Sequence, residues 1–400
     1  MVVNDGNRRM LNILVIGTGM YSTGRGTKAY GTILPAIIEW KRDNNTTGKV
    51  FFVGTDGNNN PNLNTKYKNL STDTNIDIDI SFLPKAGEKD PFAYKKAILE
   101  IPRPACAIIV VPDHLHFQVA QDCLNADLPV LIVKPLTPKV SEAKKLIKLA
   151  DDRNLYAAVE FHKRYDKSNL MIRDKYQSGE LGELLYSWVE YSQRKSIPID
   201  IFKDWAEHTS IIQYLGIHYI DIMRFITNAE PKRVMAIGQK KWISSNGIDV
   251  HDSIQCSIEW LLPDGSLFIQ ILLTNWIDPE SSSSMSDQKI NLVGTNGRFE
   301  SNQKERGIRI NSDINGIEQP NPDFCCEYGT KVGKKEWRGY GIDSVKEFLN
   351  DIFNINSGLI SRDEIKYERP TFAEAMISTA VVEAAHSSLK TDNSWVNVKF

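Results

Sequence analysis

The sequence predicts an α/β protein in which an N-terminal doubly wound parallel sheet is followed by an α/β domain with a large open, mostly antiparallel sheet. In the first half, short apolar runs alternate with helical patterns, which is typical of a parallel sheet covered by helices. In the second half, apolar residues alternate with polar ones, as at Ile254, Cys256, Ile258 and Trp260, which indicates a sheet with one covered face. We therefore expect one domain at residues 1–160 and a second at residues 161–400.

The composition is that of an ordinary globular chain. Of its 400 residues, 41% are hydrophobic and 24% charged, with a formal net charge of −2. This balance argues against nucleic acid or an anionic membrane as a partner, and no apolar run approaches the roughly 20 residues that span a bilayer. The cysteines have no regular spacing that would indicate disulfides or a metal site: Cys106, Cys123, Cys256, Cys325 and Cys326. We expect a reducing, cytoplasmic compartment.

A glycine turn follows the first apolar run. Leu11–Ile16 reads as a strand, Gly17-Thr18-Gly19 as a turn, and residues 29–41 as a helix. A phosphate-binding turn needs this order, because the first glycine permits a tight turn and the second lets the backbone approach a pyrophosphate. The helix N-terminus then offers N–H groups and a positive dipole end. Ser22 stands where a third glycine would fall, and a plain glycine loop is the alternative.

Asp56 follows the next predicted strand, Val50–Val53. A carboxylate at this point accepts hydrogen bonds from ribose hydroxyls and repels a 2′-phosphate, which favours NAD over NADP. The alternative is a turn aspartate in an Asp-Gly pair. The asparagine-rich segment 57–64 is predicted to be a loop.

The rest of the first half repeats the strand–helix alternation. The expected strands are 105–111, 130–133 and 156–161, and the expected helices are 117–125 and 141–152. Lys134-Pro135 directly follows the middle strand, at the carboxyl edge where open α/β sheets bind ligands. His114 and His116 follow the strand before it and are candidates to line the same pocket. A solvated lysine and ordinary loop histidines are the alternatives.

The second half is predicted to contain five main strands and two flanking helices. The strands are 184–191, 234–239, 253–260, 267–273 and 289–293, the helices are 170–177 and 371–389, and the serine-rich segment 275–287 is a flexible loop. The period-two pattern of these strands is the basis for expecting a mostly antiparallel sheet.

A further helix is expected at residues 210–225, and it carries a possible proton-transfer group. Tyr214, His218 and Asp221 are spaced four and three residues apart, so they would share one helix face. An imidazole is suited to proton transfer near neutral pH. The alternative is a helix histidine satisfied by its neighbouring carboxylate.

Together these motifs resemble the Gfo/Idh/MocA family, the glucose-fructose oxidoreductase and inositol dehydrogenase group. The shared motifs are the glycine turn, Pro112-Asp113-His114-Leu115-His116, Lys134-Pro135, Arg164-Tyr165-Asp166 and Gly216-x-His218-x-x-Asp221. The resemblance covers nearly the whole chain. It implies an NAD(P)-binding Rossmann domain and a substrate-binding, oligomerisation domain. It further implies hydride transfer between a nicotinamide cofactor and the CH–OH or keto carbon of a sugar, nucleotide sugar or cyclitol, in a homodimer or homotetramer.

The resemblance also implies roles for particular residues. Lys134 would orient the substrate hydroxyl and favour its deprotonation, His218 would be the general base in oxidation, and Asp221 would hold substrate or orient His218. The expected cofactor contacts are Gly17, Gly19, Met20, Asp56, Pro112, His114, His116 and Lys134. The expected substrate contacts are Lys134, Arg164, Tyr165, Tyr214, His218 and Asp221, and no metal ligand is expected.

The chain departs from the family pattern at two positions. Val133 stands where the family usually has glutamate before Lys-Pro, and Tyr214 stands where many members have aspartate. Tyr214 would donate to substrate or stack on a sugar ring. Two other functions remain as alternatives: an NAD-assisted lyase or glycosidase with transient substrate oxidation, and a non-catalytic dinucleotide-binding regulator.

Overall fold

The computed structural model describes residues 10–330 and 332–400, which form two compact units. Unit 1 combines the chain up to Leu136 with Lys144–His162 and Phe324–Glu374, and unit 2 combines Thr137–Ala143, Lys163–Asp323 and Ala375–Phe400. The expected division assigned all of residues 161–400 to the second domain. Phe324–Glu374 instead clusters with unit 1, because its helices pack on the first sheet as described below.

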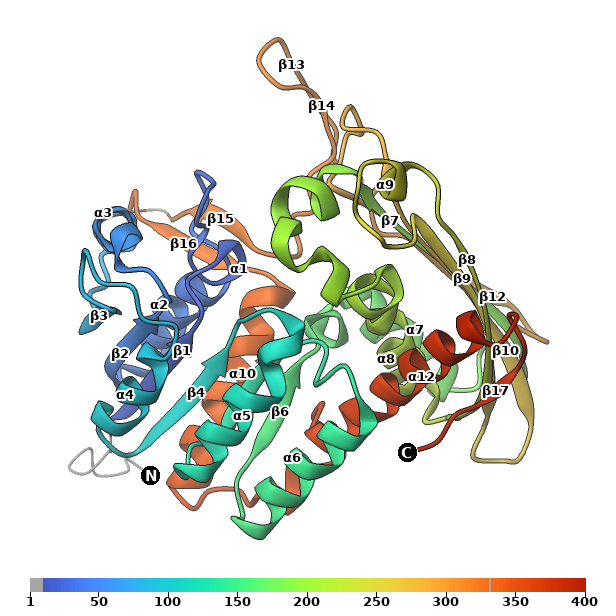
Figure 1. The fold of residues 1–400 in the computed structure, drawn as a ribbon, viewed down its shortest axis with the longest axis horizontal. Coiled ribbons are helices and arrows are strands. Elements are labelled where there is room, and N and C mark those ends of the chain that lie inside the picture. Colours follow the sequence, from blue (N-terminus) through green and yellow to red (C-terminus); the bar gives the residue numbers. More distant parts are fainter. Residues whose placement is uncertain (1–9, 331) are drawn as a thin grey trace. The chain divides into compact units, whose positions relative to one another are not determined.

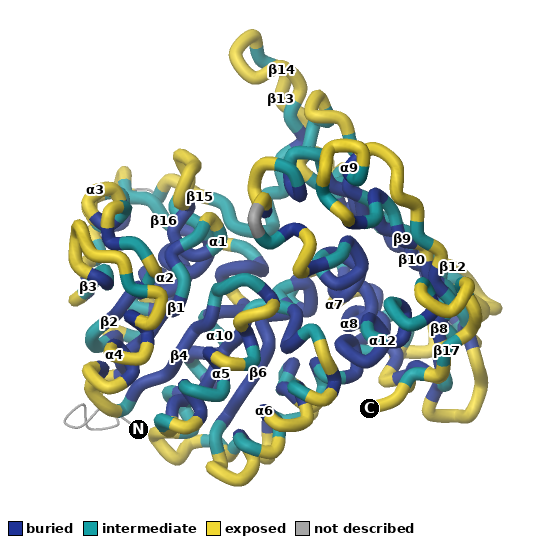
Figure 2. The backbone as a smooth tube through the Cα atoms, viewed as in Figure 1, coloured by how far each residue is buried: buried dark blue, intermediate teal, exposed yellow. Residues whose placement is uncertain are grey.

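Unit 1 is built on a six-stranded parallel sheet (Figure 1) in the order β3-β2-β1-β4-β5-β6. The strands are β1 (Leu11–Ile16), β2 (Thr47–Val53), β3 (Ile80–Leu83), β4 (Ala105–Ile109), β5 (Val130–Val133) and β6 (Ala157–Glu160). This order is that of the dinucleotide-binding doubly wound fold, so the predicted fold class of the first half is confirmed. Apart from the edge strand β3, whose residues are half-buried, the strands are buried along most of their length (Figure 2), which explains their almost continuous apolar sequence.

Helices cover both faces of this sheet. They are α1 (Met20–Thr23), α2 (Ile33–Asn44), α3 (Asn60–Thr74), α4 (Ala93–Glu100), α5 (His116–Asn125), α6 (Val140–Asp152), α10 (Tyr340–Asn356) and α11 (Arg362–Ile365). The short turns are η1 (Gly57–Asn59), η2 (Asp113–Leu115) and η3 (His162–Tyr165). One core joins α2 and α10 to β1 and β2 through Trp40, Phe348, Leu349 and Phe52, all at most 1% exposed.

Two predicted boundaries in unit 1 are wrong for local reasons. The helix expected at residues 29–41 begins only at Ile33, because a separate turn of helix, α1, follows the glycine turn. The loop expected at 57–64 is instead η1 and the start of α3. Asp56 caps η1 by accepting a hydrogen bond from the Asn58 backbone, and Pro61 lies in the first turn of α3, where its missing N–H costs nothing.

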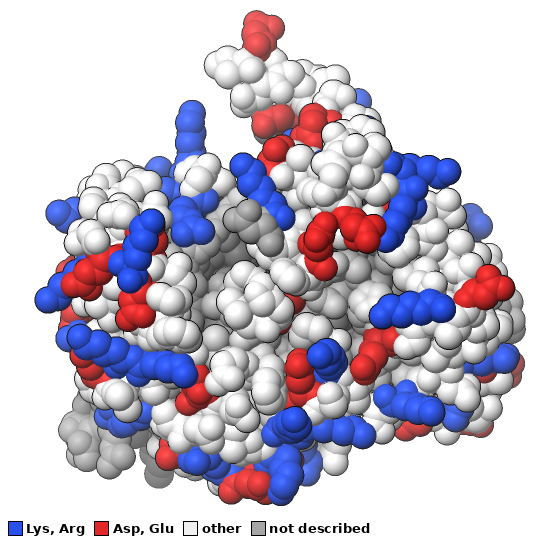
Figure 3. All heavy atoms as spheres, in the orientation of Figure 1, with Lys and Arg blue, Asp and Glu red and all other residues white. Residues whose placement is uncertain are grey.

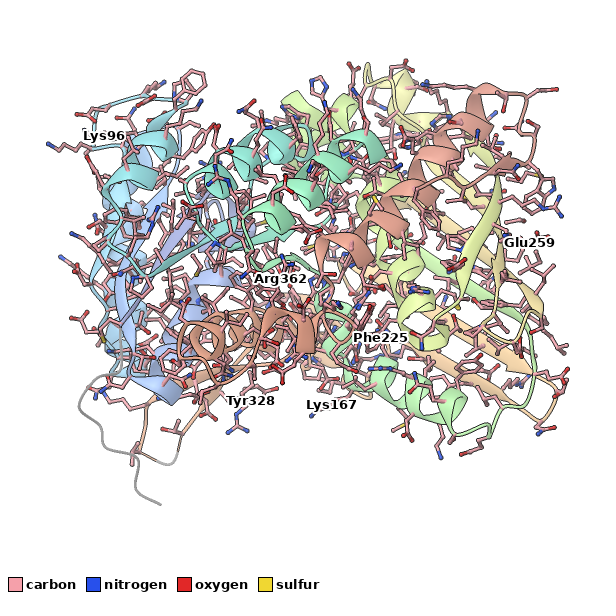
Figure 4. The ribbon with its side chains drawn as sticks, turned by 90° about the horizontal axis from the view of Figure 1, so that it is seen from below. Lys96, Lys167, Phe225, Glu259, Tyr328 and Arg362 are labelled. Atoms are coloured by element: carbon pink, nitrogen blue, oxygen red, sulfur yellow. The ribbon has the colours of Figure 1, made fainter. Side chains whose placement is uncertain are left out.

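The late segment Phe324–Glu374 is tied to unit 1 by polar contacts as well. Trp40 Nε1 donates to Asn350 Oδ1 (2.8 Å), and the Tyr156 hydroxyl donates to Asp351 Oδ2 (3.1 Å). Arg362, labelled in Figure 4, donates to the carbonyl oxygens of Ala150 and Leu155, at 3.3 Å each. These bonds join chain segments about 200 residues or more apart, which no local sequence pattern reveals.

Unit 2 is built on a seven-stranded sheet in the order β12-β11-β7-β10-β9-β8-β17. The strands are β7 (Leu184–Arg194), β8 (Glu230–Gln239), β9 (Ser253–Leu261), β10 (Leu267–Asp278), β11 (Ser286–Gly294), β12 (Arg298–Asn302) and β17 (Val396–Asn397). Only the β10–β7 pair is parallel, so the expected mostly antiparallel sheet is confirmed. The expected loop at 275–287 is shorter, since β10 continues to Asp278 and β11 begins at Ser286.

Helices cover one face of this second sheet. They are α7 (Lys167–Gln177), α8 (Ile217–Thr227), α9 (Trp242–Ser245) and α12 (Phe372–Lys390), with η4 (Ile197–Phe202), η5 (Lys203–His208) and η6 (Ile212–Gly216) between β7 and α8. The single helix expected at residues 210–225 is divided, because η6 is a wide π-helical turn and α8 starts after Gly216. A Cβ on Gly216 would come within 2.9 Å of Ile212 Cγ1, so a larger residue at this close turn would displace the Ile212 side chain.

Two hairpins complete the described chain. They are β13 (Ile310–Ser312) with β14 (Gly316–Glu318), and β15 (Cys326–Gly329) with β16 (Lys335–Arg338). The β13–β14 hairpin is mostly exposed (Figure 2). Charges of both signs are scattered over the face seen in Figure 3, and among the described residues no helix has the length and apolar character to cross a membrane.

Leu349 and Leu359 provide a matched test of the late segment's role. Leu349 is 0% exposed in α10, whereas Leu359 is 70% exposed. We expect Leu349→Ala to lower the free energy of unfolding by about 2–5 kcal/mol, since it leaves a cavity in the unit 1 core. Leu359→Ala should change that energy by less than about 0.5 kcal/mol. Urea unfolding of both variants measures this, and equal effects would contradict the assignment of α10 to the core.

Candidate functional site

The glycine turn lies at the carboxyl end of β1, where three strands come close together. Gly17 has φ +114°, and a Cβ there would lie 1.9 Å from the carbonyl oxygen of Val110. Its N–H donates to the Val53 carbonyl (2.7 Å). Glycine is therefore required at position 17 by both conformation and space. A Cβ on Gly19 would meet nothing within 4 Å, which leaves this side of the turn open to a ligand.

Ser22 explains why the third glycine of the fingerprint can be absent. Its side chain is 0% exposed, and its hydroxyl lies 2.8 Å from the Gly17 carbonyl and 3.2 Å from that of Gly19. The serine therefore braces the turn from within α1. Met20, which was expected to contact the cofactor, opens this helix and is 37% exposed.

The loop after α1 is held by Lys66, a residue that the sequence reasoning missed. The Lys66 ammonium in α3 donates to the backbone carbonyls of Gly24 (2.5 Å), Thr27 (2.8 Å) and Ala29 (2.6 Å). Burial lowers the pKa of this lysine. The three carbonyls belong to a glycine-rich loop with no sheet partner, but the sequence contains no signal that a lysine some 40 residues later satisfies them.

Asp56 lies three residues after the end of β2, where a ribose-binding carboxylate is expected. It also makes the turn contact that was the alternative. Its Oδ1 accepts from the Asn58 N–H (2.9 Å), and Lys89 Nζ lies 3.5 Å from Oδ2. The Asn58 hydrogen bond is the first cause that lowers the pKa of this carboxyl, with Lys89 adding to it. Asp56 is therefore an ionised group at the end of β2.

His116, one of the expected cofactor contacts, lies against two backbone carbonyls. It is fully buried, with Nδ1 2.7 Å from the Pro135 carbonyl and Nε2 2.9 Å from the Val111 carbonyl. Both ring nitrogens thus lie at hydrogen-bond distance from a backbone carbonyl oxygen. The ring therefore links the end of β4 to the Lys134-Pro135 turn. His114 is exposed and Pro112 half-buried in the same segment.

Lys134 is half-buried at the end of β5. Burial lowers the pKa of its ammonium to about 8, against the opposing charges of Asp113 and Glu160, which raise it. Asp113 is 4% exposed and Glu160 is 2% exposed. The expected site residue is therefore in an environment that perturbs its protonation, which is common at catalytic positions. Neither carboxylate was among the site residues expected from the sequence.

Glu160 is part of a buried polar cluster at the end of β6. It accepts a hydrogen bond from the Ser344 hydroxyl (2.7 Å), and His162 Nδ1 lies 3.0 and 3.1 Å from its two oxygens. The Tyr21 hydroxyl is 3.4 Å from the same nitrogen. Burial, followed by the charge of Glu160, raises the pKa of Tyr21 well above its usual value. The His162 ring also stacks with Tyr340.

In unit 2, Arg164 and Asp221, both expected to contact substrate, bind one another. Arg164 Nε and Nη2 donate to the two oxygens of Asp221 at 2.8 and 2.6 Å, and the residues are 5% and 1% exposed. The guanidinium also lies over Phe225, labelled in Figure 4, at 5.1 Å from the ring centroid. This bidentate pair fixes η3 to α8.

His218 lies in the first turn of α8 and is 3% exposed. The ring centroids of His218 and Tyr191 are 6.5 Å apart. The ammonium of Lys163 lies 5.3 Å from the Tyr191 centroid and 5.2 Å from that of Tyr219. Burial lowers the pKa of Lys163 to about 7, although Asp166 opposes this. Sequence reasoning missed Lys163, which has no motif of its own.

Tyr214 belongs to an aromatic cluster in unit 2. Its ring centroid is 4.7 Å from that of Phe202 and 6.1 Å from that of Trp276. Phe202 also packs against Trp205 at 4.1 Å. Tyr165 is half-buried in η3. Within the described residues, no group of three His, Cys, Asp or Glu side chains is arranged to hold a metal ion.

Comparison with known families gives two matches. A model described as an oxidoreductase family with an NAD-binding Rossmann fold matches residues 64–161, and a Gfo/Idh/MocA C-terminal domain matches residues 170–300. Together they cover more than half of the chain, which belongs to the Gfo/Idh/MocA oxidoreductase family. The sequence-based resemblance is therefore confirmed. The glycine turn itself lies before the matched residues.

Individual relatives are distant. An uncharacterized oxidoreductase of Schizosaccharomyces pombe is 26% identical over 193 residues, 48% of this chain and 51% of the relative. UDP-N-acetylglucosamine 3-dehydrogenase of Acidithiobacillus ferrooxidans is 33% identical over 133 residues, 32% of this chain and 38% of the enzyme. The matched segment thus spans about half the length of these relatives or less.

Solved structures agree with the fold over almost the whole chain. Scyllo-inositol dehydrogenase from Lactobacillus casei, solved with NAD(H) and scyllo-inositol, superposes with a TM-score of 0.66 at 14% identity, covering 98% of this chain and 99% of that one. At this identity the likeness establishes the architecture alone.

The Arg164–Asp221 pair leads to a prediction about stability. Arg164→Met leaves the Asp221 carboxylate buried without its guanidinium, which should cost about 3–5 kcal/mol of unfolding free energy. Replacing both, as Arg164→Met with Asp221→Leu, should cost clearly less than the sum of the single changes. Urea unfolding of the single and double variants measures the coupling. Strictly additive effects would mean that the pair is energetically unimportant.

Proposed function

We propose that this protein is an NAD-dependent dehydrogenase acting on a CH–OH group of a sugar, nucleotide sugar or cyclitol. The observation that carries the proposal is Lys134 at the carboxyl edge of a Rossmann sheet, where burial lowers the pKa of its ammonium and the charges of two buried carboxylates, Asp113 and Glu160, oppose that shift. The substrate class is supported by the names of relatives that act on UDP-N-acetylglucosamine and inositols. NADP is the less favoured cofactor, because Asp56 is ionised at the ribose position.

The residues of the chain fit the needs of the cofactor. The open side of Gly19 and the N-terminal end of α1 would receive the pyrophosphate, and Asp56 would accept hydrogen bonds from the ribose hydroxyls. When bound, NAD supplies the acceptor for a hydride. Met20, Pro112 and exposed His114 are proposed as further contacts on the same edge of the unit 1 sheet.

In oxidation, the carbon–hydrogen bond of the alcohol breaks and its electron pair leaves with the hydrogen as hydride. We propose that Lys134, as an ammonium, stabilises the negative charge that develops on the hydroxyl oxygen. His218 accepts the hydroxyl proton, and in reduction it returns that proton. Tyr165 and Tyr214 are proposed to contact the substrate, whereas Asp221 contributes by holding Arg164.

Two substitutions test this assignment. Lys134→Ala should lower the rate of NADH formation by about 10²–10³-fold, and His218→Ala should lower it by about 10²–10⁴-fold. Both should still bind NADH more tightly than NADPH. NADH formation with a panel of inositols and UDP-sugars, and fluorescence titration with both reduced cofactors, measure the two properties. Exposed Lys139 and exposed His208, each changed to alanine, are the controls.

The outcomes separate the alternatives. Near-normal turnover in both site variants would contradict the residue assignment. Product formation without net NADH would favour a lyase or glycosidase that recycles its bound cofactor. Cofactor binding without turnover of any substrate in the panel would favour a regulator, and binding of neither cofactor would contradict the enzyme proposal.

We further propose a homodimer or homotetramer that assembles through the uncovered face of the unit 2 sheet. Along β10, Phe268, Leu272 and Trp276 are buried, whereas the alternating Ile269 and Ile271 are only half-buried. The second set therefore faces away from the helices. A broad sheet face with apolar side chains favours contact with another copy.

Ile271→Glu tests the proposed interface. The new carboxylate would lie at the centre of a buried apolar interface without a partner of opposite charge, so the substitution should dissociate the oligomer. Leu99→Glu is the control, because Leu99 is 85% exposed in α4 of unit 1. Light scattering after size-exclusion chromatography gives the mass. A wild-type monomer, or an oligomer that survives Ile271→Glu, would contradict the proposal.

A reducing, cytoplasmic compartment is the localisation that we propose. All five cysteines are thiols, and Cys106, Cys123 and Cys256 are buried. Burial raises the pKa of these three thiols, which keeps them protonated and unreactive. A disulfide detected in the protein isolated from its cell would contradict this localisation.

A further inference from the structure

The position that lacks the family's glutamate has a carboxylate beside it on the next strand. Val133 is the last residue of β5 and pairs with Glu160, the last residue of β6. Laterally paired residues of parallel strands are neighbours about 4.8 Å apart in the hydrogen-bonding direction. A negative charge is thus present next to the Lys134-Pro135 turn, although it comes from a different strand.

Glu160 is held in place by the protein. Its carboxylate is buried, with the Ser344 hydroxyl and the His162 ring nitrogen at hydrogen-bond distance. A buried carboxylate without such partners would be costly. Both partners lie in unit 1, on α10 and η3, so the position of the charge does not depend on unit 2.

We propose that Glu160 is a positioning residue for Lys134: it supplies from β6 the carboxylate that Val133 lacks on β5, and it holds the Lys134 side chain in the ammonium form by charge. This inference deepens the proposed function, on which it rests. Opposite charges interact more strongly in a buried environment than in water. The amine that must stabilise a developing alkoxide therefore remains protonated despite its burial.

Other groups at this edge also affect the protonation of Lys134. Asp113, on η2, adds a second negative charge. His162 would reduce the effect of Glu160 when it carries a proton, because it lies against the same oxygens. Tyr21, on α1, is kept neutral by burial and by Glu160. The contribution of Glu160 must therefore be measured by changing it alone.

Competitive labelling of the full-length protein with trace acetic anhydride measures the pKa of Lys134 without any substrate. Only the neutral amine reacts, so acetylation of Lys134 over a series of pH values, found by peptide mass spectrometry, gives its titration midpoint. Lys96, which is 78% exposed in α4 and is labelled in Figure 4, is the internal reference. Glu160→Gln should lower the midpoint by about 1 unit or more, as expected on loss of a nearby opposite charge.

Matched variants separate charge from structure. Ser344→Ala removes a hydrogen bond from Glu160 and keeps the charge, so the midpoint should stay close to that of the wild type. Val133→Glu in the Glu160→Gln background returns a carboxylate to the strand of Lys134 and should raise the midpoint again. If Glu160→Gln does not fold, Glu160→Ser removes the same charge with a smaller side chain and should lower the midpoint equally.

An unchanged midpoint in folded Glu160→Gln or Glu160→Ser would overturn the inference, as would an equal fall in Ser344→Ala. These outcomes are independent of the proposed function, because the labelling needs neither cofactor nor turnover. If the protein oxidises no sugar but the midpoint falls, only the dehydrogenase proposal fails. In an active enzyme, the same change should shift the alkaline limit of kcat/KM to lower pH in Glu160→Gln but not in Ser344→Ala.

Discussion

The six-stranded parallel sheet is covered on both faces, and its carboxyl edge is therefore where polar side chains gather. The glycine turn, Asp56, Lys134 and Glu160 come from four different strand ends of this sheet. The protonation of the charged residues in this group depends on the free-energy cost of moving a charge from water into the protein. Burial weakens the ammonium form of Lys134, and two carboxylates oppose that effect. One of the two histidines of this edge, His116, lies at hydrogen-bond distance from two backbone carbonyls and links β4 to the Lys134-Pro135 turn.

Buried charges in unit 2 are also compensated by nearby groups, although the residues differ. Arg164 and Asp221 neutralise each other by a bidentate contact, and Arg306 makes a similar pair with Asp166. Lys163 is instead surrounded by the rings of Tyr191 and Tyr219 and by the side-chain oxygen of Gln303 at 3.2 Å. Buried charges of this kind add little net stability but are costly to break. The Arg164–Asp221 pair fixes η3 against α8, the helix that carries His218.

Much of the architecture could be predicted because it has a local signal. Strands β1 and β5 were predicted to the residue, since almost continuous apolar runs, broken only by Asn12 in β1, mark strands buried on both faces. The sheet of unit 2 was recognisable from alternation at Cys256, Ile258 and Trp260. Errors arose where one side chain decides the local structure. Asp56 caps η1 and so converts an expected loop into helix, and the π-helical turn before Gly216 divides an expected helix.

The candidate site was less predictable, because it depends on pairing between distant residues. Lys134 and the turn glycines follow recognisable strands and could be found from the sequence. The contact of Arg164 with Asp221 joins residues 57 apart in the sequence, and no spacing pattern indicated it. Glu160 carried no motif, because its relevance comes from the β5–β6 register. Lys66 could not be identified from the sequence either, because its contacts are with carbonyls about 40 residues away.

The return of Phe324–Glu374 to the first unit affects how the chain is made. During synthesis, the strands of unit 1 are complete by Glu160, but the apolar surface that α10 covers stays exposed until the ribosome has added more than 180 further residues. Over that interval Trp40 and Phe52 lack part of their native cover. Contacts of such long sequence separation slow folding and leave intermediates prone to aggregation. The nascent chain of this protein is therefore exposed to aggregation until α10 has been synthesised.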